Sequence, residues 1–271
     1  MTQASSFHIT VDPTNPGQFF ACCGLLELAN RLWEGAEGWF SAQGTEFHIA
    51  CGDHSRAELL DALAQATLTH VDPDDAYSSP IGVGLPFRPI EINWWECDQT
   101  GARDLKVWAG RMESYGIAHA MQHALRDPRF RSADVLQVGM VVMTPGDSGK
   151  KAKKKEPYYF DARRAPNAHA LDVGFSVDDV GLRTIAHPAV ELLCLIGLQV
   201  ARPAFTAQKR IYDYWLWPMP LTANLLLPAA TGAIQAPGAL RFRFENWFRT
   251  GKKMHKTFRF AEPFVQPGVT P

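Results

Sequence analysis

The stretch FHITVDPTNPGQFFACCGLLELANRLW, residues 7–33, sets the fold of the N-terminal half. Its first five residues alternate between apolar and polar side chains, which is the pattern of a half-buried strand. Residues 12–17 (DPTNPG) predict a turn, because proline fixes φ and glycine accepts positive φ. From Gln18 to Trp33 apolar side chains recur at helical spacing, which predicts a helix with a buried face. Gly24 weakens that helix by about 1 kcal/mol relative to alanine, and close packing against a neighbour would explain its presence.

The elements that follow extend this start into a larger pattern. Residues 40–50 (FSAQGTEFHIA) predict a hairpin with its tip at Gln43-Gly44. Ser55, with Glu58 three residues later, is a capping-box signature that starts a helix running to about Thr67. The order strand, helix, strand, strand, helix resembles the ferredoxin-like βαββαβ plan. We therefore expect an α+β fold with a ferredoxin-like (RRM/RAMP-type) N-terminal half, whose sheet has one open face.

The rest of the chain combines helical segments with a second hairpin. The residue patterns predict strands over 90–95 and 135–144 and helices over 107–125 and 187–200. The last of these helices is apolar on nearly all sides, so it should be central and buried. Residues 240–247 and 257–260 alternate and flank a basic stretch, which predicts a basic hairpin. Because no repeat and no long linker divides the chain, we expect residues 1–271 to form a single compact domain.

Composition and cysteine usage bound the class of protein. With 271 residues, of which 46% are hydrophobic, the chain can bury a sizeable core. Its five cysteines are an odd set without a CxxC pair, which favours free thiols in a reducing compartment over disulfides or a zinc site. The first ten residues do not resemble a signal peptide, and no apolar run is long enough to span a bilayer. We therefore expect a cytoplasmic protein that does not contact a membrane.

Sequence motifs that would support an enzyme are absent. There is no GxxxxGK[ST] phosphate loop and no GxSxG elbow. His119 and His123 have the spacing of zinc ligands, but the residue after the first is alanine, where the metalloprotease motif has glutamate. Asp172, Asp178 and Asp179 share one loop-like stretch, where carboxylates cap turns more often than they bind a metal. We expect no catalytic residue, no metal and no cofactor.

Charge is distributed unevenly along the chain. Residues 1–149 hold 9 Lys and Arg against 19 Asp and Glu, a net charge of −10, whereas residues 150–271 hold 18 against 9, a net charge of +9. Such asymmetry suggests one acidic face and one face suited to a polyanion. The alternative is that both signs mix on the folded surface, because counts alone say nothing of placement.

Two clusters in the basic half combine cations with aromatic side chains. The first contains Lys150, Lys151, Lys153, Lys154, Lys155, Tyr158, Tyr159, Arg163 and Arg164. The second contains Arg241, Arg243, Arg249, Lys252, Lys253, Lys256 and Arg259, with Trp247, Phe248 and Phe258 between them. Cations neutralise phosphates and release counterions, and rings stack on unpaired bases, so both clusters predict nucleic-acid contacts. The alternatives are that the lysine run keeps a loop in solution and that the rings fill the core.

Two further features have predicted surface roles. Residues 145–157 (PGDSGKKAKKKEP) contain no apolar side chain larger than alanine, which predicts a mobile basic loop. Trp94-Trp95 and residues 215–217 place several aromatic rings in turn-rich segments. Exposed aromatic rings often mark partner surfaces, so we expect these segments to contact other proteins.

Residues 7–33 and the later stretch EPYYFDARRAPNAHALDVGFSVD, residues 156–178, together resemble a known family. They are similar to two blocks of the small Csb-type CRISPR-associated proteins of type I-U (I-G) systems. The resemblance covers about 50 residues, under a fifth of the chain. It implies a subunit of the RNA-guided surveillance complex, Cascade, in antiviral defence. The implied partners are guide RNA or target DNA, the other Cascade subunits and the helicase-nuclease.

The role within such a complex stays open between three alternatives. A non-catalytic, large-subunit-like part would contact target DNA near its protospacer-adjacent motif (PAM) and help to recruit the helicase-nuclease, and we favour this one. A RAMP-type part would bind or process guide RNA, but residues 228–244 lack the dense glycine pattern of guide-processing RAMP proteins. A protein-only subunit would use its acidic half to dock a basic partner.

Overall fold

The segment at residues 7–33 folds as its pattern predicts. A computed structural model describes residues 4–75, 77–97, 102–109, 112–132, 134–146, 153–165, 185–234, 236–249 and 255–264. In it, strand β1 (Phe7–Thr10) is followed by helix α1 (Pro16–Leu32). The side chain of Asn15 accepts a hydrogen bond from the Gly17 N–H and caps α1, and Pro16 occupies the first turn, where its missing N–H costs nothing.

Helix α1 lies on a small antiparallel sheet. Strands β2 (Glu37–Phe40) and β3 (Glu46–Ala50) form the expected hairpin, and β3 pairs with β1. Helix α2 (Arg56–Gln65) follows with the predicted capping box at Ser55. Strand β9 (Leu221–Thr222), from much later in the chain, pairs with β2, so that the strand order is β1-β3-β2-β9. The α+β class is therefore confirmed.

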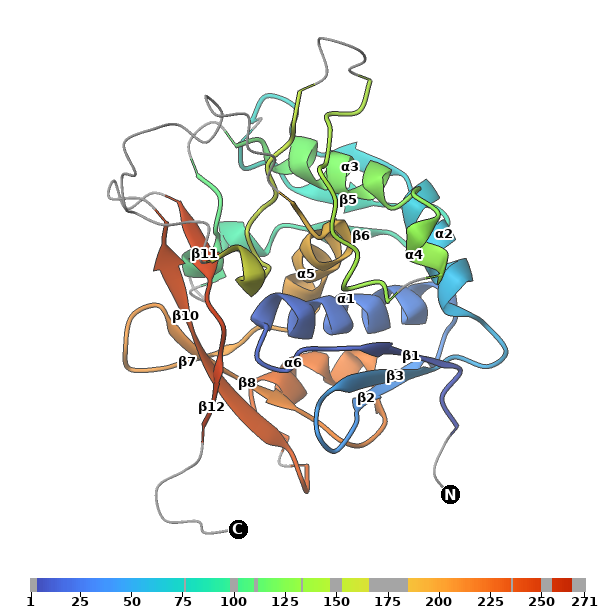
Figure 1. Ribbon diagram of the computed structural model, residues 1–271, viewed down its shortest axis with the longest axis vertical. Coiled ribbons are helices and arrows are strands. Elements are labelled where there is room, and N and C mark those ends of the chain that lie inside the picture. Colours follow the sequence, from blue (N-terminus) through green and yellow to red (C-terminus); the bar gives the residue numbers. More distant parts are fainter. Residues whose placement is uncertain are drawn as a thin grey trace.

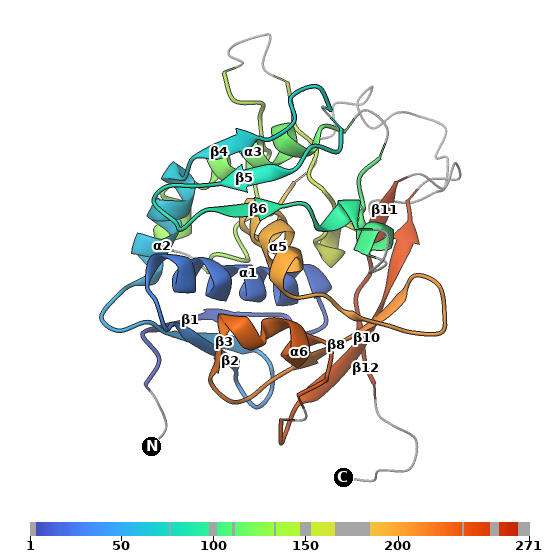
Figure 2. The same ribbon diagram turned by 180° about the vertical axis from the view of Figure 1, so that it is seen from behind.

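The strand after α2 belongs to another sheet. Strand β4 (Leu68–His70) pairs with β5 (Ile81–Val83), and β5 pairs with β6 (Ile90–Ile92). Helix α5 (Pro188–Val200) is buried almost throughout, as its apolar pattern predicts. Together with α1 it separates the β4-β5-β6 sheet from the β1 sheet (Figures 1 and 2).

The crossing of α1 and α5 explains the glycine in the first helix. A Cβ atom on Gly24 would lie 2.1 Å from the carbonyl oxygen of Leu193, and one on Gly197 would lie 1.9 Å from that of Phe20. Two helix backbones therefore touch directly, and each of these two positions leaves room for hydrogen alone. Close packing at Gly24 is confirmed, and the two helices form the centre of the core.

A third sheet forms one flank of the molecule and includes the basic hairpin. It contains β7 (Ala204–Phe205), β8 (Ile211–Leu216), β10 (Leu240–Phe248), β11 (Lys256–Phe258) and β12 (Glu262–Pro263), all paired antiparallel. On its inner face the ring of Tyr214 stacks on Phe19 of α1, with 4.5 Å between centroids. The sheet is thereby fixed to the end of the α1 layer, and the short helix α6 (Leu226–Ala230) lies beside β8 (Figure 2).

Two predicted elements differ from the structure. Helix α3 (Ser114–Ala124) starts seven residues later than the pattern predicts, because Val107 is engaged elsewhere: its carbonyl accepts a hydrogen bond from the Lys256 N–H. Residues 135–144 form no regular strand but make two isolated bridges, Met140 to Ala186 and Met143 to Lys154. The remaining short helices are α4 (Arg129–Ser132) and the 3-10 turns η1 (Trp94–Glu96), η2 (Ala102–Leu105), η4 (Ala162–Arg164) and η5 (Ala223–Leu225).

The tryptophan-rich segments prove to be core. Trp94, Trp95 and Trp217 are each at most 2% exposed, and the ring of Trp108 packs edge-on against both Trp94 and Trp95. The prediction that these tryptophans form a partner surface is therefore wrong for all but Trp215, which is half-buried. Among the described helices, none is long and apolar enough to cross a membrane.

Candidate nucleic-acid interface

The two basic clusters of the sequence meet at Tyr159. The Thr257 hydroxyl, 98 positions away in the chain, donates a hydrogen bond of 3.1 Å to the carbonyl oxygen of Tyr159. The N–H of Phe258 donates to the same oxygen at 3.3 Å. Strand β11, which is one side of the basic hairpin, is thereby joined to the YYFDARR segment. Folding thus brings the first cluster beside the second.

The ring of Tyr159 is the centre of this junction. The Arg249 guanidinium lies over it, 3.4 Å from the ring centroid, and the Arg164 guanidinium lies 4.9 Å from the same centroid. The Tyr159 hydroxyl donates to the Glu156 carboxylate at 2.7 Å. Lys154 also pairs with Glu156, at 2.7 Å, and although burial opposes it, these two hydrogen bonds keep the pKa of Glu156 below its usual value. Among the described residues, the Glu156 carboxylate therefore sits beside three cations, Arg249, Arg164 and Lys154, which gives this part of the junction a positive excess.

The YYFDARR segment is anchored on the first helix. The Asn15 side chain, which caps α1, donates to Asp161 at 2.8 Å, and it also accepts from the Ala162 N–H at 3.1 Å. Arg163 and His187 bind the same carboxylate. Burial alone would raise the pKa of Asp161, but the hydrogen bonds from His187 and Arg163 hold it far below the usual range. The two sequence blocks of the family resemblance are therefore in direct contact.

Glu191 of α5 binds the backbone of the YYFDARR segment. Its carboxylate accepts backbone hydrogen bonds from Tyr159, Phe160 and Asp161, at 3.0 to 3.3 Å. Full burial, with the neighbouring charge of Asp161, nevertheless raises the pKa of Glu191 to about 7. The backbone of the segment is thus fixed by a buried acid that titrates near neutrality.

These anchors place several predicted contact residues inside the protein. Tyr158 is 0% exposed, and its hydroxyl donates to the Ser114 carbonyl. The side chain of Arg164 is 5% exposed, and Arg163 is bound to Asp161. Tyr158 and Tyr159 therefore pack in the core and do not offer a ring to a base. The two arginines bind carboxylates of the protein, Asp161 and Glu156, and so support the site structurally.

The lysines of the first cluster lie nearer the surface. Lys153 is exposed, while Lys154 and Lys155 are partly exposed and pair with Glu156 and Glu113. Backbone hydrogen bonds link residues 153 and 155 to Thr144 and Val142, so this end of the predicted basic loop is held in place. Lys150 and Lys151, like Lys252 and Lys253 of the second cluster, lie outside the described residues, as do Asp172, Asp178 and Asp179.

Lys256 points into a basic pocket that also contains Lys106 and Arg103. Neither of the last two residues was predicted to bind anything. In the sequence Lys106 is a single cation between Leu105 and Val107, so no local pattern distinguishes it from any surface lysine. Its proximity to Lys256 comes from the contact between residues 105–108 and strand β11, which joins segments far apart in the chain.

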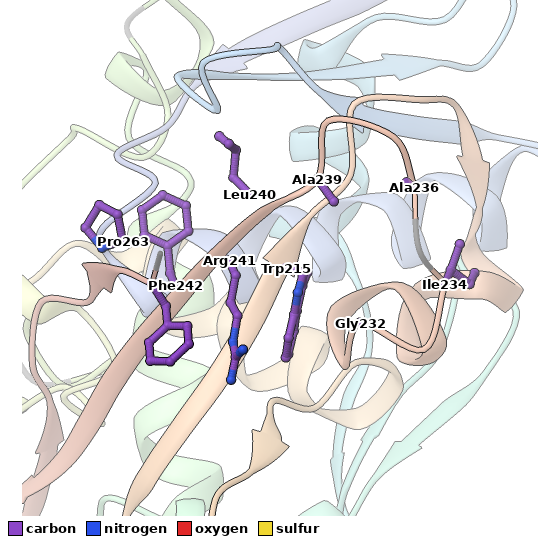
Figure 3. A pocket seen from close by; sticks show the side chains of 10 residues that line it. Trp215, Gly232, Ile234, Ala236, Ala239, Leu240, Arg241, Phe242 and Pro263 are labelled. Carbon is purple, nitrogen blue, oxygen red and sulfur yellow. The ribbon is translucent and has the colours of Figure 1, made fainter. Parts of the chain in front are cut away.

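A second hollow, of about 700 Å³, lies at the other end of β10. Trp215 and Arg241 are direct cross-strand neighbours on β8 and β10, and Figure 3 shows them side by side in its wall. The Arg241 guanidinium lies over the rings of Trp215 and Phe264, at 4.9 and 4.0 Å, and pairs with Asp213. Because this cation is engaged within its own sheet, the hollow suits an apolar group better than a phosphate.

No protein-family model, no curated protein and no solved structure matches the chain.

Proposed function

We propose that this chain is a non-catalytic nucleic-acid-binding subunit of a type I CRISPR surveillance complex. Its role would be that of a large subunit, which contacts target DNA and helps to recruit the helicase-nuclease. The observation that supports this most directly is the meeting of the two basic clusters at Tyr159. A protein that used either cluster only for solubility would have no need to join them.

The chemistry of the junction favours phosphates over bases. Lysine ammonium groups are flexible point charges, which suit contacts with phosphate oxygens and carry no base preference. Of the rings in the two clusters, Tyr158, Tyr159 and Phe258 are buried, whereas Trp247 is 39% exposed and lies under the Arg259 guanidinium. In RNA-guided complexes base pairing reads the sequence, while the protein recognises backbone and shape. A surface that offers mainly charge, with few exposed rings, fits recognition of the nucleic-acid backbone.

The N-terminal sheet supports the finer fold assignment within the same proposal. Strands β1, β3 and β2 are antiparallel in that order, with α1 packed on one face. This arrangement resembles the first half of the ferredoxin-like plan, in which a helix connects two strands that are separated by a third. In the proposal, this unit is the module on which the basic segments are mounted through Asn15.

Other Cascade subunits would bind the apolar end of the third sheet. Leu225 and Leu227, at the start of α6, are 39% and 46% exposed, and Met219 nearby is 42% exposed. The 700 Å³ hollow is lined by Trp215 of β8, the strand that α6 contacts. Exposed apolar side chains of this kind often mark protein interfaces.

The proposal is tested by binding measurements on the full chain and on the complex with its sibling subunits. Fluorescein-labelled single-stranded RNA, single-stranded DNA and duplex DNA are titrated at two salt concentrations. We expect affinity that falls steeply with salt, because phosphate contacts release counterions. Salt-independent binding, or none in the assembled complex, would refute it. A single-turnover assay on repeat RNA separates the rival endoribonuclease, which would cleave without added subunits.

The subunit contact is tested separately by Leu227→Lys. We expect loss of co-purification with sibling subunits and an unchanged melting temperature, since the side chain is half exposed. Val71→Lys is the matched control, because Val71 is 48% exposed but follows β4 on the far side of the α1 layer. Equal effects of both variants would mean that α6 is not the contact.

A further inference from the structure

The basic pocket beside β11 has a volume of about 420 Å³. Lys256, the first residue of β11, forms one side of it. Arg103 belongs to η2, and Lys106 is the residue that follows η2. Tyr77 and Ser78 complete the rim. Three cations from two distant parts of the chain thus face one hollow. Asp104 also lines the pocket, but its backbone carbonyl is the atom that contacts Lys256.

Two hydrogen bonds from the core hold the rim of the pocket. The Trp95 indole N–H donates to the carbonyl of Ser78 at 2.7 Å, and the Trp108 indole N–H donates to that of Tyr77 at 3.3 Å. Both indoles belong to the buried tryptophan cluster. The rim at residues 77–78 is therefore tied to the core, so a ligand would not have to order it.

The two lysines keep donors that the protein does not use. The Lys106 ammonium donates to the Ser78 hydroxyl at 2.8 Å and lies 5.0 Å from the centre of the Trp108 ring. The Lys256 ammonium donates to the Asp104 carbonyl. Each ammonium has three donors. Within the described part of the chain, neither lysine has a carboxylate oxygen within ion-pair distance.

The electrostatics of the pocket favour an anion. Burial lowers the pKa of Lys256 to about 8, and the nearby charges of Arg210, Lys209 and Lys106 act in the same direction, against the Asp104 carboxylate. Burial likewise lowers the pKa of Lys106, and Arg103 acts in the same direction, against the carboxylates of Asp75 and Glu96. Cations that depress one another's pKa are destabilised by their own proximity, and an anion placed between them removes that penalty.

We propose that the pocket binds a single phosphate group, held jointly by the ammonium groups of Lys106 and Lys256 with Arg103 at the rim. The inference rests on the proposed function in that it takes this phosphate to belong to a nucleic-acid backbone. Phosphate fits better than carboxylate, because its several oxygens can accept from both ammonium groups at once. Tyr77, 46% exposed at the rim, can stack on the adjoining base.

The joint grip has a measurable consequence in the salt dependence of binding. Lys106→Met and Lys256→Met each remove a charge but keep most of the side-chain length. For single-stranded DNA bound by the assembled complex, we expect either variant to reduce the slope of log affinity against log salt by roughly 0.7, the value for one phosphate. The double variant should reduce the slope by the same amount and not by twice as much, since both lysines hold one phosphate. Two additive reductions would overturn the shared site.

Lys153→Met is the matched control, because Lys153 is an exposed cation of the other cluster. It too should lower the slope, but its effect should add to that of Lys256→Met. Melting temperatures of all variants establish that they fold. Additivity at Lys153 together with non-additivity at Lys106 and Lys256 supports the inference, and additivity at every pair contradicts it.

A second measurement on the wild-type chain separates this inference from the proposed function. Pyrophosphate and inorganic phosphate are titrated while the Lys256 side-chain resonances are followed by NMR. We expect a saturable shift and a higher Lys256 pKa, both abolished in Lys106→Met. If this shift occurs but no oligonucleotide binds, the pocket takes a free phosphoester and the proposed function fails. The other outcome is that oligonucleotides bind but the Lys256 resonances do not shift, either with phosphate or on DNA binding. The pocket inference is then wrong, while the proposed function stands.

Discussion

The Arg249 guanidinium lies over the Tyr159 ring at 3.4 Å, and this contact joins a basic hairpin to a basic segment that precedes it by almost a hundred residues. Stacking of this kind contributes about 0.5–2 kcal/mol. Its importance here is positional, because Tyr159 bears no charge but determines where the neighbouring cations lie.

We expect Tyr159→Ala to weaken nucleic-acid binding although it removes no cation. Without the ring, Arg249 and Arg164 lack their common surface, and the two clusters are no longer held together. Tyr159→Phe is the control: it keeps the ring and removes the hydrogen bond to Glu156, at about 1 kcal/mol of stability. Equilibrium titration with labelled single-stranded DNA at fixed salt measures the difference. Equal affinities for both variants would show that the junction has no part in binding.

Replacing Lys150, Lys151, Lys153, Lys154 and Lys155 together by alanine should weaken binding for all sequences alike. It should also flatten the salt dependence by roughly 0.7 to 0.9 log units of slope for each phosphate that is no longer neutralised. Stability should change little, because Lys154 and Lys155 form partly exposed ion pairs of small energy. An unchanged slope in the assembled complex would make the lysine run a solubility device.

Arg164 should matter for stability rather than for affinity alone. Its side chain is 5% exposed and contacts both Tyr159 and Glu156. Arg164→Ala leaves the Glu156 carboxylate with fewer partners, which should reduce the free energy of unfolding by about 1–3 kcal/mol. Lys153→Ala, at an exposed position, should leave it unchanged. Urea denaturation of both variants measures this, and an Arg164→Ala variant as stable as the wild type would contradict the burial.

Gly24→Ala should destabilise the protein by about 2 to 3 kcal/mol or more, despite the better helix propensity of alanine. The new methyl group would lie 2.1 Å from the Leu193 carbonyl oxygen and force α1 and α5 apart. Gly84→Ala is the matched control, since its methyl group would meet nothing closer than 3.8 Å. Thermal unfolding of the two variants should differ by several degrees. Similar melting temperatures would mean that the helices do not cross at this glycine.

Glu191 predicts a pH dependence of stability. Its pKa is about 7 in the folded chain and near its ordinary value when unfolded, so the folded state binds the extra proton between about pH 4.5 and 7. The contribution of Glu191 to the free energy of unfolding is therefore fully present below about pH 4.5, and it is lost as the pH rises through 7. Asp161, whose pKa is lowered, acts in the opposite sense and only at lower pH.

The variant Glu191→Gln does not titrate and isolates this effect. Relative to the variant, the wild type should become less stable between about pH 5 and about pH 8. Denaturant midpoints at the two pH values measure the change. A stability difference between the two proteins that stays constant over that interval would show that the three backbone hydrogen bonds keep the carboxylate ionised throughout.

The elements that could be predicted are those whose causes lie within a few residues. The helix at α1, the capping box at Ser55, the buried helix α5 and the basic hairpin all follow from apolar period, caps and turn residues. The segments at 107–109 and 135–144 differ, because the periodicity of their apolar side chains is not matched by a regular hydrogen-bond ladder. The Val107 carbonyl accepts a hydrogen bond from the Lys256 N–H and not from a helical N–H. No local sequence pattern indicates this long-range contact.

The candidate site, too, could be predicted only in part from the sequence. Composition and local pattern establish that residues 150–271 are basic and that Arg249 and Lys256 lie on a hairpin. Which cations face outward is settled by tertiary packing, because burial depends on distant partners. Asn15, Asp161 and Glu191 draw the YYFDARR segment into the core, and the meeting of β11 with residues 105–108 places Lys106 beside Lys256. Charge is a property of composition, whereas the distance between two charges is a property of the fold.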